Sequence, residues 1–127
     1  MAKRASASKS ELEIARVVWS LGEAGVRDVL AALPADRKMD FSTVQTYLRR
    51  LHTKGYLRAR RVGRSNLYRP AVKPTSVVRD VVDDLLDRLF GGDALPLVQH
   101  LIHERGLSVA EIDQLQQLLD ELKERKR

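Results

Sequence analysis

The residues of this chain that could do chemistry gather on one face of a predicted helix that follows Asp40. That face carries hydroxyl, amide and guanidinium groups and no carboxylate, and its members are Ser42, Thr43, Gln45, Thr46, Arg49, Arg50 and Thr53. Short hydroxyls and amides can bond to base edges in a DNA major groove, and guanidinium groups can bond to guanine or to phosphate. The chemistry predicted here is recognition of a nucleic acid by hydrogen bonds and charge.

The lack of acidic residues around this helix distinguishes a nucleic-acid-binding helix from an ordinary polar surface helix. Exposed helices commonly mix acidic and basic residues, because such pairs support helicity and solubility. From Phe41 to Ala71 the chain has eight Lys or Arg residues and no Asp or Glu. Five arginines crowd the end of this stretch, namely Arg58, Arg60, Arg61, Arg64 and Arg69. The missing carboxylates favour a polyanionic partner.

Periodicity predicts the elements that position these groups. Helices are expected over 10–21, opened by a Ser10–Glu13 capping box, and over 26–33. A third is expected from the N-cap Asp40 to Lys54, with Gly55 ending it and an apolar stripe of Phe41, Val44, Leu48 and Leu51. Two strands, 56–62 and 67–69, should follow. Three helices and a hairpin predict a mainly α winged helix-turn-helix with a two- or three-stranded wing.

Composition narrows the class of protein. Residues 1–73 hold 16 Lys or Arg against 6 Asp or Glu, whereas residues 74–127 hold 7 against 11. This asymmetry is typical of a nucleic-acid-binding module joined to another region. The sequence has no cysteine, no apolar run of membrane-spanning length and no signal-like start, which predicts a cytoplasmic protein. No catalytic constellation stands out, so no enzyme activity and no cofactor are expected. His100 and His103 lack the further ligands that a metal site needs.

The C-terminal region has more apolar positions than a linker requires. Helices are predicted over about 78–90 and 94–104, and a last one is opened by a Ser108–Glu111 capping box. A thin monomer cannot bury such faces, which predicts a homodimer held by this region. The expected dimerisation residues are Val78, Val81, Val82, Leu85, Leu86, Leu89, Phe90, Leu97, Leu101, Leu115, Leu119 and Leu122. The predicted organisation is a basic arm (1–9), a winged-helix domain (10–71) and a helical dimerisation domain (75–124).

Several motifs in order resemble the penicillinase repressor (BlaI/MecI) family of winged-helix transcriptional regulators. They are Glu11-Leu12-Glu13, Val18-Trp19, Val26-Arg27-Asp28-Val29-Leu30, the run Ser42 to Leu51, Lys54-Gly55-Tyr56-Leu57, Gly63-Arg64, Tyr68-Arg69-Pro70, Phe90-Gly91-Gly92, Leu107-Ser108 and Glu111-Ile112. The resemblance covers the chain from about Ser8 to Leu122.

The resemblance implies a homodimeric repressor that binds double-stranded DNA at a palindromic operator. By position, Ser42, Thr43, Gln45, Thr46 and Arg49 would read bases, and Arg50, Lys54, Arg61 and Arg64 would hold phosphates. It also implies relief of repression by proteolysis, triggered by a membrane metallopeptidase that senses β-lactams, near the bond His100–Leu101. A role in antibiotic resistance is one expectation that follows.

A second interpretation from another class is a winged-helix protein-interaction module that applies its basic face to an acidic protein. Sequence-selective binding with a steep salt dependence would favour DNA over that partner.

Overall fold

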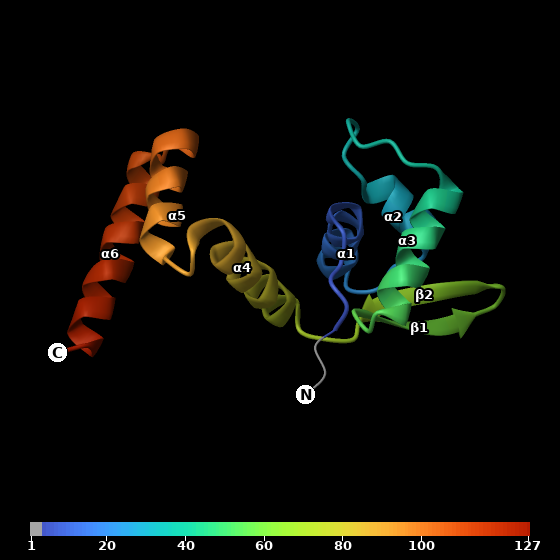
Figure 1. Cartoon of the computed structure of the whole chain (residues 1–127). Coiled ribbons are helices and arrows are strands. Elements are labelled where there is room, and N and C mark those ends of the chain that lie inside the picture. Colours follow the sequence, from blue (N-terminus) through green and yellow to red (C-terminus); the bar gives the residue numbers. More distant parts are fainter. Residues whose placement is uncertain (1–3) are drawn as a thin grey trace. The chain divides into compact units, whose positions relative to one another are not determined.

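The computed structural model describes residues 4–127, so Met1 to Lys3 of the expected basic arm lie outside the described residues. The chain divides into two compact units, Met1–Arg79 and Asp80–Arg127, and each is described by itself. The helices and strands in chain order are α1 (Lys9–Leu21), α2 (Val26–Ala32), α3 (Phe41–Thr53), β1 (Leu57–Val62), β2 (Ser65–Pro70), α4 (Pro74–Phe90), α5 (Ala94–His100), the π-helical turn η1 (Leu101–Arg105) and α6 (Val109–Arg125) (Figure 1).

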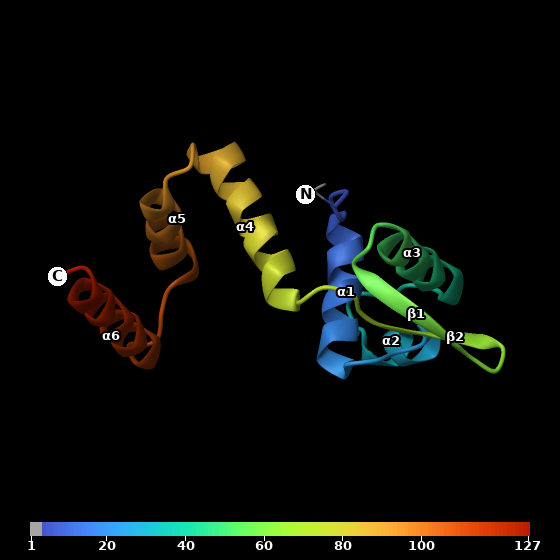
Figure 2. The same cartoon turned by 90° about the horizontal axis from the view of Figure 1, so that it is seen from below.

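The first unit has the predicted order of three helices and a hairpin. Figure 2 shows β1 and β2 lying beside α1, α2 and α3, with the hairpin turn extending past the helices. The core draws on every element of the unit, and its fully buried large apolar side chains are Ile14, Val18, Val29, Val44, Leu48, Leu51, Leu57 and Val77. Val77 belongs to the first turn of α4, so the boundary between the two units falls inside that helix.

Helix α1 begins earlier than predicted, and the expected Ser10–Glu13 capping box is wrong. Ser8 is the N-cap: its Oγ accepts from the Glu11 N–H at 3.1 Å, and its own N–H donates to Glu11 Oε1 at 2.8 Å. Both Ser-x-x-Glu spacings fit a capping box. The Ser8 register prevails because it allows Glu11 to be buried against Lys54, whereas Glu13 faces outward and pairs with Arg37.

Helix α3 starts and ends as predicted, but one residue of its stripe is not in the core. Asp40 caps the helix by accepting from the Thr43 N–H at 2.8 Å, and Gly55 follows its end with φ +89°. A positive φ strains any residue with a Cβ, which explains the glycine there. Val44, Leu48 and Leu51 are fully buried, whereas Phe41 is exposed. Phe41 is the first residue of the helix and lies beside Arg27 of α2.

The wing is a two-stranded antiparallel sheet with a tighter turn than predicted. The pairing runs from Leu57 opposite Pro70 to Val62 opposite Ser65, so only Gly63 and Arg64 make the turn. Ala24 adds a single bridge beside β2, donating to the Tyr68 carbonyl at 2.9 Å and accepting from its N–H at 2.8 Å. The wing is thereby joined by main-chain bonds to the loop that precedes α2.

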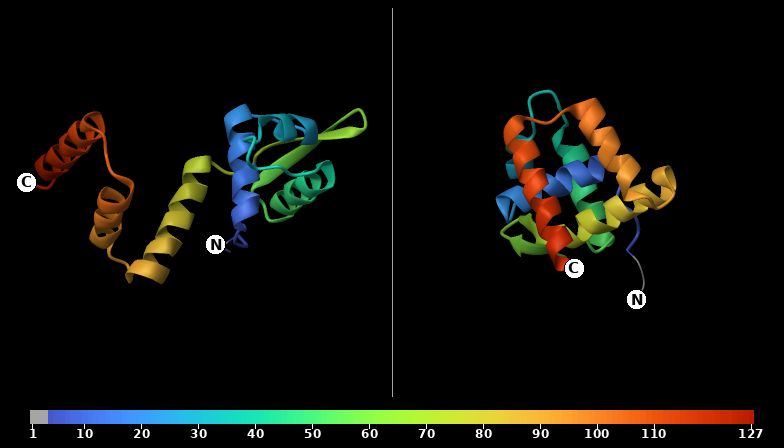
Figure 3. Two further views of the ribbon diagram at one scale, coloured as in Figure 1. Left: turned by 90° about the horizontal axis from the view of Figure 1, so that it is seen from above. Right: turned by 90° about the vertical axis from the view of Figure 1, so that its left-hand side faces the viewer.

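The second unit consists of helices without a core of their own. None of the residues from Asp80 to Arg127, all of them described, is buried. The Ser108–Glu111 capping box that opens α6 is confirmed, with hydrogen bonds of 3.1 Å in each direction. The helix expected over 94–104 changes form after His100, where η1 takes over. Figure 3 shows α5 and α6 as separate segments joined by a loop. In the described part of the chain, no helix is long and apolar enough to cross a membrane.

The pair formed by Glu11 and Lys54 links the start of α1 to the end of α3. The Lys54 Nζ donates to Glu11 Oε1 at 2.6 Å and to the Ser6 carbonyl at 3.0 Å. Burial alone would raise the pKa of Glu11. The hydrogen bonds from Lys54 and Ser8 and the charge of Lys54 outweigh burial, so this pKa lies below its ordinary value of 4.5. Helix α3 is therefore fixed at its C-terminal end by a charge pair.

We predict that Glu11→Gln lowers the free energy of unfolding by about 3 kcal/mol near neutral pH, because Lys54 loses its buried counter-charge. The Glu11 carboxylate stabilises the fold fully above pH 4.5, and this contribution is lost as the pH falls through its lowered folded pKa. The difference between wild type and variant should therefore shrink in acid. Urea unfolding at several pH values measures both effects.

The matched control is Glu13→Gln, because Glu13 pairs with Arg37 at 2.7 Å in an exposed setting. An exposed pair contributes less than about 1 kcal/mol. Equal losses in the two variants would contradict a structural role for the Glu11–Lys54 pair.

Candidate nucleic-acid interface

The outward face of α3 presents the polar groups predicted to read bases. Ser42, Thr46, Arg49 and Arg50 are exposed, and Thr43 and Gln45 are half-buried at its edges. Two hydroxyls have their protons engaged within the helix: Ser42 Oγ donates to Asp40 Oδ1 at 3.1 Å, and Thr46 Oγ1 donates to the Ser42 carbonyl at 2.9 Å. In this arrangement both oxygens offer lone pairs outward, which suits the amino groups of adenine or cytosine.

Asp40 directly precedes the carboxylate-free stretch, and its own negative charge is already engaged in hydrogen bonds. Hydrogen bonds from Thr43 and Ser42 lower the pKa of Asp40 and keep it ionised as the N-cap. Its charge lies at the positive end of the α3 dipole and is balanced there. The positive charge of Arg49 and Arg50 on the α3 face is therefore not neutralised by Asp40.

A cleft of about 430 Å³ lies between the start of α2, the α3 face and the wing. Four guanidinium groups line it, from Arg27, Arg49, Arg61 and Arg64, together with Phe41, Gln45, Asn66 and neighbouring backbone. Its one carboxylate, Asp28, accepts from the Gly25 N–H at 2.8 Å as the cap of α2. Four cations against one engaged carboxylate make the cleft a site for an anion, such as a phosphodiester backbone.

The wing is held against the helices by an ion pair as well as by the Ala24 bridge. Arg60 donates from Nε and Nη2 to the two carboxylate oxygens of Glu23, both at 2.8 Å. The hydrogen bond from Arg60 lowers the pKa of Glu23, and the pairing raises that of Arg60. Arg60 is thus occupied in anchoring the wing. The arginines nearer the turn, Arg61 and Arg64, remain beside the cleft.

The predicted phosphate contacts lie in different settings. Arg61 and Arg64 line the cleft, with Arg61 Nε donating to the Gly63 carbonyl at 3.3 Å. Arg50 is exposed, and its guanidinium lies 5.9 Å from the centre of the Tyr47 ring. Lys54 differs from the rest, because its ammonium is bonded to Glu11 and only 27% of its side chain is exposed. The phosphate contact of Lys54 stays a prediction, and the ion pair also gives this residue a part in positioning α3.

Two cleft residues were not among the predicted contacts. The sequence predicts Arg27 only as part of the second helix and Phe41 only as part of the apolar stripe of the third. The structure brings them together, with the Arg27 guanidinium 5.7 Å from the Phe41 ring centre. A signal for Phe41 was present in the sequence: it directly follows the N-cap, where a side chain has no preceding helical turn to pack on.

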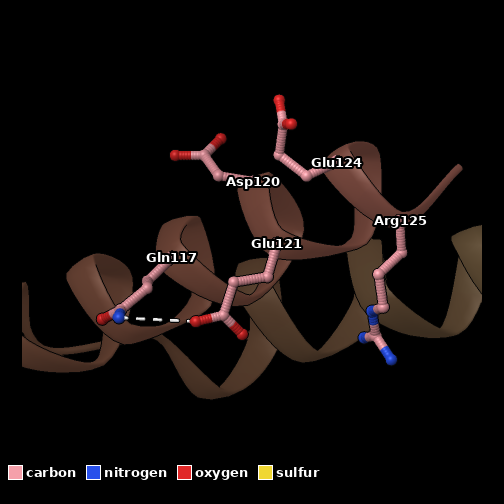
Figure 4. Close-up of a pocket in the computed structure, with 5 residues that line it drawn as sticks. All are labelled: Gln117, Asp120, Glu121, Glu124 and Arg125. Atoms are coloured by element: carbon pink, nitrogen blue, oxygen red, sulfur yellow. Dashed lines mark hydrogen bonds between the residues drawn. The ribbon is translucent and has the colours of Figure 1, made fainter. Parts of the chain in front are cut away.

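Other parts of the described chain offer weaker sites. No group of three or more His, Cys, Asp or Glu side chains within residues 4–127 is arranged to hold a metal ion. A second hollow lies on α6 and is lined by Gln117, Asp120, Glu121, Glu124 and Arg125 (Figure 4). Its three carboxylates have the wrong charge to attract a nucleic acid.

Comparison with known proteins finds a family, relatives and a solved structure to which this chain is similar. The model of a family described as "Penicillinase repressor" matches residues 7–121. A penicillinase repressor of Bacillus licheniformis is 30% identical over 127 residues, covering 100% of this chain and 99% of its own length. An uncharacterized 16.5 kDa protein of Latilactobacillus sakei is 36% identical over 110 residues, covering 87% of this chain and 75% of its own. The solution structure of the DNA-binding domain of the repressor BlaI matches with a TM-score of 0.51 and 31% identity, over 59% of this chain and 92% of that one.

We predict that Arg49→Ala weakens binding to a preferred duplex by about 1–3 kcal/mol and relaxes selectivity at one base pair, as expected for a guanine-reading arginine. Arg64→Ala should instead weaken binding to all duplexes alike and reduce the salt slope by about 1, as expected for a phosphate contact. Fluorescence anisotropy with preferred and random duplexes over a range of salt measures both. Equal losses on the two duplexes for Arg49→Ala would move Arg49 to the phosphate-binding set.

Proposed function

This chain belongs to the penicillinase repressor family, and from that premise we propose that it represses transcription as a homodimer bound to a palindromic operator. The family consists of repressors and not of enzymes, and the chain is accordingly a DNA-binding transcriptional repressor. In the proposal each protomer places α3 in one half-site, and the two protomers are joined through α4, α5 and α6.

The DNA-binding half of the proposal is supported by the cleft and the α3 face. Ser42, Thr43, Gln45, Thr46 and Arg49 would read base edges, and Arg27, Arg50, Arg61 and Arg64 would hold phosphates. A wing beside a recognition helix lets a protein bind the major groove and the neighbouring backbone together. The anchored position of the wing means that little ordering is needed on binding, which favours affinity.

The observation that carries the dimer is the absence of any buried residue from Asp80 to Arg127. Large apolar side chains are exposed along all three helices, for example Leu89 at 71% and Leu119 at 54%. Exposed apolar surface on this scale is costly in water and marks an interface. The proposed interface residues are those predicted from the sequence: Val78, Val81, Val82, Leu85, Leu86, Leu89, Phe90, Leu97, Leu101, Leu115, Leu119 and Leu122.

Helix α6 distinguishes the face to be covered from the face left in water. Leu115, Leu119 and Leu122 recur at spacings of four and three residues, which places them along one side of the helix. Gln117, Asp120, Glu121 and Glu124 line the hollow drawn in Figure 4, and their spacing places them on the other side of the helix. The apolar side of α6 would therefore pack in the dimer, and the carboxylates would remain solvated.

A second copy of the chain is the partner that also explains operator recognition. A two-fold axis would present two α3 helices about 34–36 Å apart, one turn of B-DNA. Linking two weak half-site contacts raises affinity by a factor of about 10²–10⁴. Dimer strength then controls operator occupancy, so anything that separates the C-terminal helices would release the DNA.

Proteolysis is the proposed means of release. The bond suggested by family position, His100–Leu101, joins the last residue of α5 to the first of η1. A π turn interrupts regular α-helical bonding and is often found at functional sites. Cleavage there would separate α6 from α4 and remove its share of the interface. A membrane metallopeptidase that responds to β-lactams is the proposed trigger.

We predict that Leu119→Glu converts a dimer to a monomer and weakens operator binding by about 100-fold or more, because the two half-sites are no longer linked. Sedimentation equilibrium and anisotropy measure the two effects on the same sample. Gln117→Glu is the matched control. Gln117 precedes Leu119 by two residues, which places it on the opposite side of α6, so the added carboxylate should leave both unchanged. A wild-type protein that is monomeric at micromolar concentration would refute the dimer.

Cells that express the chain beside a membrane metallopeptidase should yield two fragments after exposure to a β-lactam. Mass spectrometry of the affinity-purified protein is expected to place the new termini at His100 and Leu101. Recovery of only the intact chain, while the regulated promoter is nonetheless induced, would exclude relief by cleavage.

A further inference from the structure

We propose that the Phe41 ring is a specificity-determining contact that reads the C5-methyl group of a thymine in each half-site. The proposal rests on the DNA-binding function above and adds a residue that sequence periodicity assigns to the apolar stripe of α3. It is carried by the exposure of Phe41, by its position in the cleft and by its contact with Arg27.

Phe41 is 44% exposed, although a buried place for an aromatic ring would be more stable. A single exposed apolar side chain is ordinary on a protein surface, so exposure alone assigns no role. Position does: Phe41 is the first residue of α3, and Gln45 and Arg49 follow at four-residue steps on the same side. All three line the cleft that faces the wing. The ring therefore belongs to the surface that is to meet the DNA.

Arg27 holds the ring from the side of α2. Its guanidinium lies 5.7 Å from the Phe41 ring centre, within the range of a cation–π contact. Arg27 is also a cleft residue, so the planar group that orients the ring can bond to a phosphate at the same time. An oriented ring loses less conformational freedom when a base contacts it.

The chemistry of the ring selects its partner on the DNA. The major-groove edges of the four base pairs carry hydrogen-bond donors and acceptors, and the one apolar group among them is the thymine methyl. A phenyl edge offers no hydrogen bond to the other groups, so placing it against an amino or carbonyl group would leave that group unpaired. Methyl recognition by Phe41, next to amide recognition by Gln45, would define two neighbouring positions of a half-site.

The test removes only the methyl group. The full-length protein first selects its preferred duplex from a random-sequence pool. Each thymine of one half-site is then replaced singly by deoxyuridine, which lacks the methyl and keeps the base-pairing edge. Wild-type protein should lose about fourfold in affinity at one position, the factor for burial of one methyl-sized group. Phe41→Ala should bind more weakly overall and show no further loss at that position.

The control is Leu21→Ala, because Leu21 is equally exposed at 45% and lies outside the cleft. It should retain both the wild-type affinity and the wild-type response to deoxyuridine. Phe41→Leu, which keeps an apolar group, should retain part of the response. Thermal unfolding of each variant separates a lost contact from a lost fold.

Each outcome decides one claim. If no duplex is enriched by selection, the proposed function fails. If a duplex is enriched but wild-type affinity is insensitive to every deoxyuridine, methyl recognition by this protein is refuted without any variant. If Phe41→Ala remains as sensitive as wild type, the methyl is read by another residue and the assignment to Phe41 is overturned.

Discussion

Uncompensated positive charge on a rigid surface is the constraint that shapes the first unit. Asp40 and Asp28 are engaged as helix caps, and Glu23 is engaged by Arg60, so the carboxylates nearest the cleft do not neutralise its arginines. Repulsion among Arg27, Arg49, Arg61 and Arg64 is tolerated because the elements that carry them are fixed by other means. The Glu11–Lys54 pair fixes α3, and the Ala24 bridge fixes the wing. A polyanion relieves this repulsion, which connects the stability of the fold to its function.

The second unit differs from the first in what it lacks. The first unit lacks counter-charges for its arginines, whereas the second lacks a hydrophobic core. Its helices carry exposed apolar side chains along their length and no buried residue from 80 to 127. The proposed function supplies two partners of different kinds, duplex DNA for the first unit and a second copy of the chain for the other. Their coupling would give a repressor whose occupancy of DNA depends on the integrity of a helical interface in the other unit.

Signals within one helical turn of the sequence were sufficient to predict where most helices and strands begin and end. Asp40, Gly55 and the Ser108–Glu111 box act where capping chemistry predicts, because a cap depends on residues within one turn. Errors arose where contacts distant in the sequence decide. Ser8 replaces Ser10 as the N-cap since Glu11 meets Lys54, 43 residues away, and the same contact gives Lys54 a structural part that spacing alone does not reveal. Phe41 fits the helical period but is exposed at the start of α3, and no spacing rule reveals its neighbour Arg27.

The salt dependence of operator affinity tests most directly whether the helix–wing surface binds DNA through its uncompensated arginines. With about four phosphate contacts in each protomer of a dimer, a plot of log affinity against log salt should have a slope near −7. Preference for the operator over random duplex should persist along that line. A slope shallower than about −2, or equal affinity for operator and random duplex at every salt concentration, would contradict this basis of recognition.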